Sequence, residues 1–290
     1  MQFIEDFILK NLYVAPLYHQ TRENQKKMNT GIVIPCYNEA NRLDYNAFQS
    51  FLTLHSDYHL CFVNDGSKDD TLAFLKRMQQ GFETQISIVD CKTNGGKAEA
   101  VRQGILKMSQ VPELEYIGFL DADLSVSLEE FTDLVQTIHS DSTLKIVSGS
   151  RVKRMGAVIN RNLKRHLIGR SIATLISLLL GMPFYDTQCG AKVFRKELVH
   201  VGFRSPFQSA WLFDVELFMR MKKYYGIQAA MNFILEYPLR RWVHVEDSKI
   251  GASDLIKIPL QLIKIQYHYQ LKPKFALTLP FANETLSLES

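Results

Sequence analysis

Short apolar runs alternate with segments of helical periodicity along the first half of this chain. The apolar runs are GIVIPCY, HLCFVND, QISIVDC, EYIGFLDAD and KIVSGSR, and the segments between them are DYNAFQSFLTLH, KDDTLAFLKRMQQ, KAEAVRQGILKMSQ and SLEEFTDLVQTIH. Such regular alternation favours a mostly parallel central sheet that is flanked by helices on both faces. The sequence therefore predicts an α/β fold, and ligands of such sheets bind at the carboxyl ends of the strands.

Composition adds few constraints. The chain has 290 residues, of which 46% are hydrophobic and 22% charged, as in an ordinary globular protein. Its net charge of +4 gives no reason to expect a nucleic-acid partner. The four cysteines lie far apart in the sequence, which favours reduced thiols over a zinc site. The sequence is compatible with a monomer or with a homo-oligomer.

No segment has the ~18 to 20 apolar residues that a membrane-spanning helix needs. The uncharged stretch 171–185 is too short and is interrupted by Gly181 and Pro183. The first residues do not resemble a secretory signal, because acidic residues stand where a basic region should be and Lys10 interrupts the apolar stretch. We therefore expect a cytoplasmic protein.

Two aspartates, Asp121 and Asp123, directly follow the apolar run YIGFL. A buried carboxylate is costly unless it is paired or binds a cation, so we expect both at the exit of a buried strand, facing solvent or a cation. A helix start with Asp123 or Ser125 as its N-cap is the simpler interpretation. It explains one of these residues but not the aspartate pair.

Other strand ends also carry candidate chemistry. Asp65 stands in an Asp-Gly turn, and its carboxylate could accept hydrogen bonds from a nucleobase. Lys97 follows two glycines, either as an ordinary helix start or as a lysine that faces a phosphate together with free N–H groups. The glycine patterns of P-loops and dinucleotide-binding domains are absent.

In combination, these pieces resemble a known family. VIPCYNEANRL, VNDGSKDDT, NGGKAEAVRQG, DADLS, SGSR, DTQCGAKVFRKE and WLFDVELFMR occur in the order seen in family 2 glycosyltransferases of the GT-A fold. From about residue 30 to 255, the chain resembles the branch that contains dolichyl-phosphate β-glucosyltransferases and other polyprenyl-phosphate glycosyltransferases. It departs from many relatives at Ala98, where they carry glycine, and it lacks the C-terminal transmembrane helices of some of them.

The resemblance implies a donor site for a UDP-sugar. The residues expected to line the nucleotide pocket are Pro35, Tyr37, Asn38, Glu39, Asp65, Lys97, Asp121, Ala122 and Asp123. Within this set Asp65 would read the uracil, and Lys97 would lie near the base, the ribose or the phosphates. Asp121 and Asp123 would hold Mg²⁺ or Mn²⁺ against the diphosphate, since hard cations prefer carboxylate oxygens. Such an ion neutralises the charge that develops on the departing UDP.

The second half of the chain would form the acceptor side. By resemblance Asp214 has a role at the acceptor, whereas Glu216 is expected to be a structural residue of the same helix. The stretch 151–170 is rich in Lys and Arg and contains no acidic residue, which fits either a solvated basic face or a clamp for an acceptor phosphate. The candidate phosphate ligands are Arg151, Lys153, Arg154 and Lys249.

We therefore expect a metal-dependent inverting transferase that moves a sugar, with glucose as the expected one, from a UDP-sugar to a polyprenyl phosphate. Transfer to a hydroxyl of a glycan or soluble acceptor, nucleotidyl transfer, and a non-catalytic sensor remain as alternatives. The expected organisation is an N-terminal extension over 1–28, a GT-A domain with acceptor-side helical elements over 29–255, and a C-terminal amphipathic helix and tail over 256–290. This last helix either packs on the core or lies at a membrane surface. We favour membrane contact, as a peripheral protein on the inner face of the cell membrane.

Overall fold

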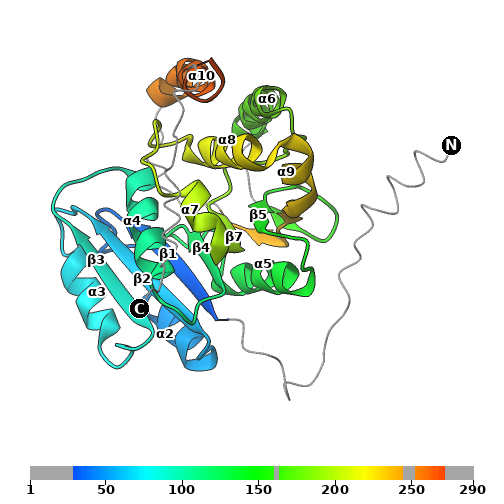
Figure 1. Cartoon of the computed structure of the whole chain (residues 1–290). Coiled ribbons are helices and arrows are strands. Elements are labelled where there is room, and N and C mark those ends of the chain that lie inside the picture. Colours follow the sequence, from blue (N-terminus) through cyan, green and yellow to red (C-terminus); the bar gives the residue numbers. More distant parts are fainter. Residues whose placement is uncertain (1–28, 160–162, 244–251, 272–290) are drawn as a thin grey trace, which may run out of the picture.

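The computed structural model describes residues 29–159, 163–243 and 252–271 (Figure 1). The strands are β1 (Thr30–Cys36), β2 (Tyr58–Asp65), β3 (Ile86–Cys91), β4 (Tyr116–Leu120), β5 (Ile146–Ser150), β6 (Val158–Ile159), β7 (Ala191–Arg195), β8 (Ile234–Pro238) and β9 (Arg241–Trp242). The helices are α2 (Tyr45–Leu54), α3 (Thr71–Gln79), α4 (Lys97–Ser109), α5 (Leu128–Ser140), α6 (Leu163–Leu180), α7 (Val199–Gly202), α8 (Phe213–Tyr225), α9 (Ile227–Phe233) and α10 (Ala252–Gln266).

Seven strands form the central sheet, in the order β3-β2-β1-β4-β7-β5-β8. Strand β7 is antiparallel to both of its neighbours, β4 and β5, and the remaining pairs are parallel. The predicted α/β architecture with a mostly parallel sheet is thus confirmed. The sequence pattern did not predict β7 or its position between β4 and β5.

Helices cover both faces of the sheet, because its central strands bury side chains alternately on either side. In β1, Val33 belongs to the core cluster that contains residues of α4 and α8, whereas Ile32 and Ile34 belong to the cluster that contains residues of α2 and α5. Figure 1 shows α6 and α10 at the same end of the molecule, beyond α8. Two cores result, and the core that contains α4 and α8 also contains the helices of the second half.

The start of α5 differs from the predicted one. The N-cap is Ser127, whose hydroxyl accepts the backbone N–H of Glu130, and neither Asp123 nor Ser125 takes this role. Instead, Oδ1 of Asp123 accepts the backbone N–H of Ser125 in the preceding turn. The aspartate pair is therefore separate from the helix cap.

Helix α10 packs on the core through Leu262 and Ile265, which are buried, and through Ile258, which is partly buried. The predicted boundary between residues 255 and 256 falls inside this helix. None of the helices in the described ranges is both long and apolar enough to cross a bilayer.

Candidate active site

The carboxyl ends of β2, β1 and β4 lie side by side at one edge of the sheet, because these strands are adjacent and parallel. Strand β4 is buried throughout and leads directly to Asp121, whose N–H donates to the carbonyl of Gly190. The side chains of Asp121 and Asp123 are 36% and 26% exposed, while Ala122 between them is buried. Both carboxylates therefore lie at the exit of a buried strand, as predicted.

Each of these carboxylates faces a cation. The Lys97 ammonium lies 2.5 Å from Oδ1 of Asp121, and an Arg42 guanidinium nitrogen lies 3.7 Å from Oδ2 of Asp123. Arg42 also pairs with Glu39 at 3.3 Å. Burial by itself lowers the pKa of Lys97, but the surrounding carboxylates, Asp121 first, outweigh this effect and raise the pKa above its ordinary value.

The two aspartates fit a divalent cation in their chemistry and exposure. They offer hard oxygen ligands at an accessible edge, and Gly190 leaves no Cβ atom beside the Asp121 carboxylate. No group of three or more Asp, Glu, His or Cys residues that could hold a metal occurs within 29–159, 163–243 and 252–271. An ion held by Asp121 and Asp123 would thus have coordination positions left for phosphate oxygens or water.

The loop after β1 is tied to the loop after β2. Asn38 has a positive φ of 52°, its N–H donates to the Ser67 hydroxyl, and its side-chain oxygen accepts the N–H of Lys68. The N–H of Glu39 donates to the hydroxyl of Thr71. These bonds fix the first predicted nucleotide-binding segment, in which Pro35 and Tyr37 are half-buried.

Asp65 is nearly buried, and its carboxylate is engaged by the protein backbone. Oδ1 accepts the N–H of Gly95 at 2.8 Å and Oδ2 accepts the N–H of Gly96 at 2.9 Å. Gly96 has a φ of +84°, a conformation that favours glycine, and α4 begins at the next residue, Lys97. Asp65 therefore positions the loop that places Lys97, and contact of Asp65 with a uracil stays a prediction.

Asp214 reaches the same site from the first turn of α8. Its side chain is 6% exposed, and its Oδ1 lies 2.7 Å from the ammonium of Lys192 in β7. Burial raises the pKa of Asp214, and Lys192 and Lys97 oppose this increase. The charges of Asp121 and Asp214 both raise the pKa of Lys97, so this lysine couples the predicted donor-side and acceptor-side carboxylates electrostatically.

Two cations of this site, Lys192 and Arg42, were not predicted from the sequence. Lys192 is the one charged residue in the apolar run AKVF, and a lysine in such a run could have indicated a buried ion pair. Arg42 stands within the motif NEANRL, but only the folded loop brings it to Asp123. Glu216 is a structural residue, as predicted: it is fully buried and accepts the N–H groups of Gln208 and Ser209.

The predicted phosphate-binding cations are placed differently from one another. Arg151 donates through Nε and one terminal nitrogen to Asp186, at 2.6 and 2.7 Å. A guanidinium has five N–H donors, so this pair uses two of them. Arg154 donates to the carbonyl of Pro238, and Lys153 is exposed. Lys249 lies outside the described residues.

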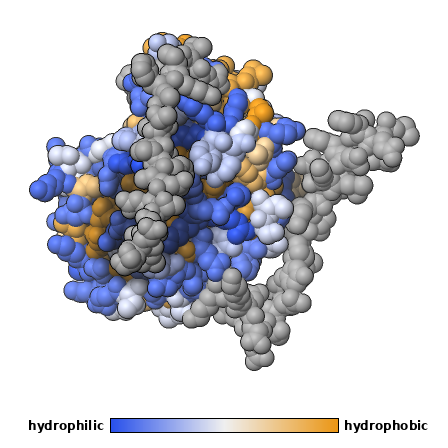
Figure 2. Space-filling model, viewed as in Figure 1, coloured by the Kyte–Doolittle hydropathy of each residue, from blue (hydrophilic) through white to orange (hydrophobic). Residues whose placement is uncertain are grey.

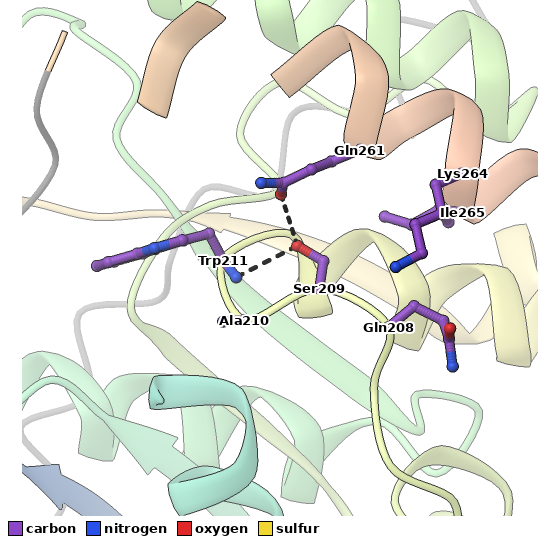
Figure 3. A pocket seen from close by; sticks show the side chains of 7 residues that line it. All are labelled: Gln208, Ser209, Ala210, Trp211, Gln261, Lys264 and Ile265. Atoms are coloured by element: carbon purple, nitrogen blue, oxygen red, sulfur yellow. Dashed lines mark hydrogen bonds between the residues drawn. The ribbon is translucent and has the colours of Figure 1, made fainter. Parts of the chain in front are cut away.

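A cavity of about 190 Å³ lies between α10 and the loop that leads into α8 (Figure 3). It is lined by Gln208, Ser209, Ala210, Trp211, Gln261, Lys264 and Ile265. A Cβ atom at Gly96 would lie 3.3 Å from the Cβ of Ala210, so one wall of the cavity lies against the loop that precedes α4. The cavity is therefore close to the loop that positions Lys97.

The hydroxyl of Ser209 connects α10 to the start of α8. It donates to Oε1 of Gln261 and accepts the N–H of Trp211 (Figure 3). It also accepts the N–H of Leu212. Asp214 lies two residues after Leu212. The contact between α10 and this loop therefore contributes to the placement of the predicted acceptor-side carboxylate.

Comparison with known proteins gives a family. The model of glycosyl transferase family 2 matches residues 31–203. A dolichyl-phosphate beta-glucosyltransferase of Trichomonas vaginalis is 30% identical over 83% of this chain and 72% of its own length. Enzymes of the same name from Saccharomyces cerevisiae and Homo sapiens are 30% and 27% identical, over 86% and 76% of this chain and 77% and 68% of their own lengths.

Among solved structures, glucosyl-3-phosphoglycerate synthase of Mycobacterium tuberculosis in complex with UDP has a TM-score of 0.61. It is 17% identical, and the match covers 88% of each chain. The same enzyme in complex with Mn²⁺ and UDP-glucose also has a TM-score of 0.61, with 17% identity over 86% of this chain and 81% of that one. At this identity the likeness concerns the fold. The chain thus belongs to glycosyl transferase family 2 and has the GT-A fold, and its relatives in sequence include dolichyl-phosphate beta-glucosyltransferases.

Proposed function

We propose that this protein transfers glucose from UDP-glucose to a polyprenyl phosphate, with inversion at the sugar. The observation that carries the proposal is the ion pair of Lys97 with Asp121 at the carboxyl end of the buried strand β4. The ammonium of Lys97 thus pairs with Asp121 at the predicted donor site, and the charge of Asp214 at the predicted acceptor site acts on it as well. The names of the relatives supply the sugar and the class of acceptor.

On the donor side, Asp121 and Asp123 would hold a Mg²⁺ or Mn²⁺ ion, and that ion would neutralise charge on the diphosphate. Lys97 adds a fixed positive charge beside Asp121. The loop that contains Asn38 and Glu39 is held by its bonds to the loop after β2, and would bind the nucleotide. These residues bind and orient the donor.

On the acceptor side, the chemistry depends on the attacking group. A phosphomonoester has a second pKa near ~6 and is already anionic at neutral pH, so it hardly needs a general base. Asp214 would then orient groups at the acceptor. A hydroxyl acceptor, the second candidate, would need Asp214 as a base. Lys153, with Arg151 and Arg154, would contact an acceptor phosphate from the segment that follows β5.

The test is incubation with radiolabelled UDP-glucose, Mn²⁺ and dolichyl or undecaprenyl phosphate, followed by organic extraction. We expect label in the lipid phase, loss of label with EDTA, and loss in Asp121→Asn. Glu113→Gln is the matched control, because Glu113 is exposed and precedes β4 at the opposite edge of the sheet. Absence of labelled lipid with every common UDP-sugar would contradict the proposal.

The same assay separates the two acceptor classes. Asp214→Asn should abolish transfer to a hydroxyl, which needs a base, and should reduce transfer to a phosphate less severely. A thermal-shift series with UDP, GDP and TDP sugars, with and without Mn²⁺, tests the nucleotide and the metal together. We expect a shift with UDP-sugars that increases with Mn²⁺, and no such increase in Asp121→Asn.

We also propose that α6 and α10 contact a membrane surface. In addition to its buried face, α10 has a second apolar face in which Leu260 and Ile263 are 69% and 64% exposed. Leu178 of α6 is also exposed, and Figure 2 shows apolar side chains at the end of the molecule where both helices lie. The sequence of α6 contains Lys and Arg but neither Asp nor Glu, which suits anionic lipids.

A further inference from the structure

Lys192 is a fully buried lysine in the middle of the central sheet. It lies in β7, opposite Phe119 of β4 and Ser148 of β5, and it has no exposed surface. Its ammonium lies 2.7 Å from Oδ1 of Asp214, donates to the carbonyl of Cys189 at 2.7 Å, and lies 5.4 Å from the centre of the Phe119 ring. A buried ammonium is destabilising unless it is paired. The presence of a lysine at this buried position is therefore explained best by a function of its ion pair with Asp214.

The anionic form of Asp214 is favoured by its ion pair with this lysine. In the part of the chain that the structure describes, Lys192 is the group in ion-pair contact with Asp214. Lys97 also favours the anion, because its charge lowers the pKa of Asp214, although less than Lys192 does. The ion pair of Lys97 itself is with Asp121. Removal of Lys192 would therefore leave a buried carboxylate without a direct counter-ion, and such a carboxylate takes up a proton.

We propose that Lys192 is a positioning residue for Asp214, whose carboxylate it holds in one orientation and in the anionic form at the acceptor side of the site. The ammonium can do this because it is itself fixed by the Cys189 carbonyl and by the strands on either side of β7. The role rests on the proposed function, in which Asp214 acts at the acceptor. Lys192 acts through Asp214 and does not contact the reacting groups.

The first test compares Lys192→Met with Lys192→Arg in the lipid-labelling assay. We expect Lys192→Met to lower kcat by ~10-fold or more, because positioned acid–base and orienting groups contribute on this scale. The KM for UDP-glucose should stay within about twofold, since the Lys192 ammonium contacts Asp214 and the Cys189 carbonyl. Lys192→Arg keeps the charge and should recover part of the loss.

The pH profile provides a readout that a merely structural role would not change. Lys192 lowers the pKa of Asp214, so its removal should move the acid limb of the kcat profile to higher pH. Lys192→Arg should leave the limb near its wild-type position. Lys222→Met is the matched control: Lys222 lies on the same helix as Asp214, but its ammonium donates to the carbonyl of Leu180. It should change neither kcat nor the limb.

A double variant tests whether Lys192 acts through Asp214. We expect Asp214→Asn and the double variant Lys192→Met with Asp214→Asn to have the same kcat within about twofold, because the partner of Lys192 is already neutral in both. The double variant leaves neither a buried lysine nor a buried carboxylate unpaired at this position, so it also replaces the comparison if Lys192→Met alone does not fold. A further ~10-fold loss in the double variant would overturn the proposal.

The outcomes for the function and for Lys192 are distinguishable. A wild-type chain that transfers no sugar to lipid phosphate contradicts the proposed function. A wild-type chain that transfers, together with a folded Lys192→Met variant of equal kcat and equal pH profile, overturns the role of Lys192 alone.

Discussion

A Cβ atom at Gly190 would overlap with the carboxylate of Asp121, so the position of this carboxylate requires glycine at residue 190. The two residues are also joined through the backbone, where the N–H of Asp121 donates to the carbonyl of Gly190 at 3.0 Å. Gly190 immediately precedes β7, the antiparallel strand. The insertion of β7 beside β4 thus shapes the end of β4 at which the two aspartates lie.

Gly190→Ala should impair donor binding while the fold is kept. The added methyl group would push away the Asp121 carboxylate, which is the end of a side chain and can move, so we expect a loss of ~1 kcal/mol in unfolding free energy. The KM for UDP-glucose, or the Mn²⁺ concentration at half-maximal rate, should rise ~10-fold or more. Steady-state kinetics and urea unfolding measure the two effects. Gly169→Ala is the control, because a Cβ atom there meets nothing within 4 Å, and equal kinetics of both variants would contradict the prediction.

The pH dependence of transfer should depend on Asp214. Burial raises the pKa of this carboxyl above the ordinary value of about 3.9, so its anion is lost at a higher pH than for an exposed aspartate. With a phosphate acceptor, a second group of pKa near ~6 must also be ionised, and the rate should fall steeply as the pH decreases. In Asp214→Asn only the acceptor titrates, and the residual rate should fall less steeply. Rates at saturating substrate over about pH 4.5 to 8 test this. Profiles of the same slope would argue against a role for the Asp214 anion.

Ser209→Ala should weaken both the fold and the acceptor site. The hydroxyl of Ser209 accepts two backbone N–H groups before α8 and donates to Gln261 of α10. Loss of a buried hydroxyl that satisfies two backbone N–H groups costs ~1 to 2 kcal/mol of unfolding free energy. Urea unfolding and the KM for the lipid acceptor provide the measurements. Ser205→Ala, at an exposed serine of the same connection, should change neither, and a Ser209→Ala variant of wild-type stability would refute the assignment.

Charged residues on the outer face of α10 should reduce membrane binding. Leu260→Glu together with Ile263→Glu places carboxylates on exposed positions of the helix, so the packing of its buried face should be unaffected. We expect less co-sedimentation with phosphatidylcholine vesicles that contain phosphatidylglycerol, and unchanged binding of UDP. Leu54→Glu on α2 is the matched control, since Leu54 is exposed to a similar extent, 65%. Equal co-sedimentation of both variants would indicate that another part of the chain, or no part, binds the vesicles.

The sequence by itself determined the local elements and the order of the strand-end motifs. Short apolar runs located β1 to β5, and helical apolar periodicity located the helices between them, because such patterns depend only on which sides of an element are buried. The position of Asp121 and Asp123 at the exit of a buried strand followed from the same reasoning. The family followed from the order of the motifs.

Only the tertiary structure decided the partners of these residues. The insertion of β7 between β4 and β5 brings Lys192 to Asp214, and the loop after β1 brings Arg42 to Asp123. The carboxylate of Asp65 is engaged by two backbone N–H groups from a loop about thirty residues away. Periodicity along the chain is a local property, whereas the neutralisation of a buried charge depends on which distant elements pack against it.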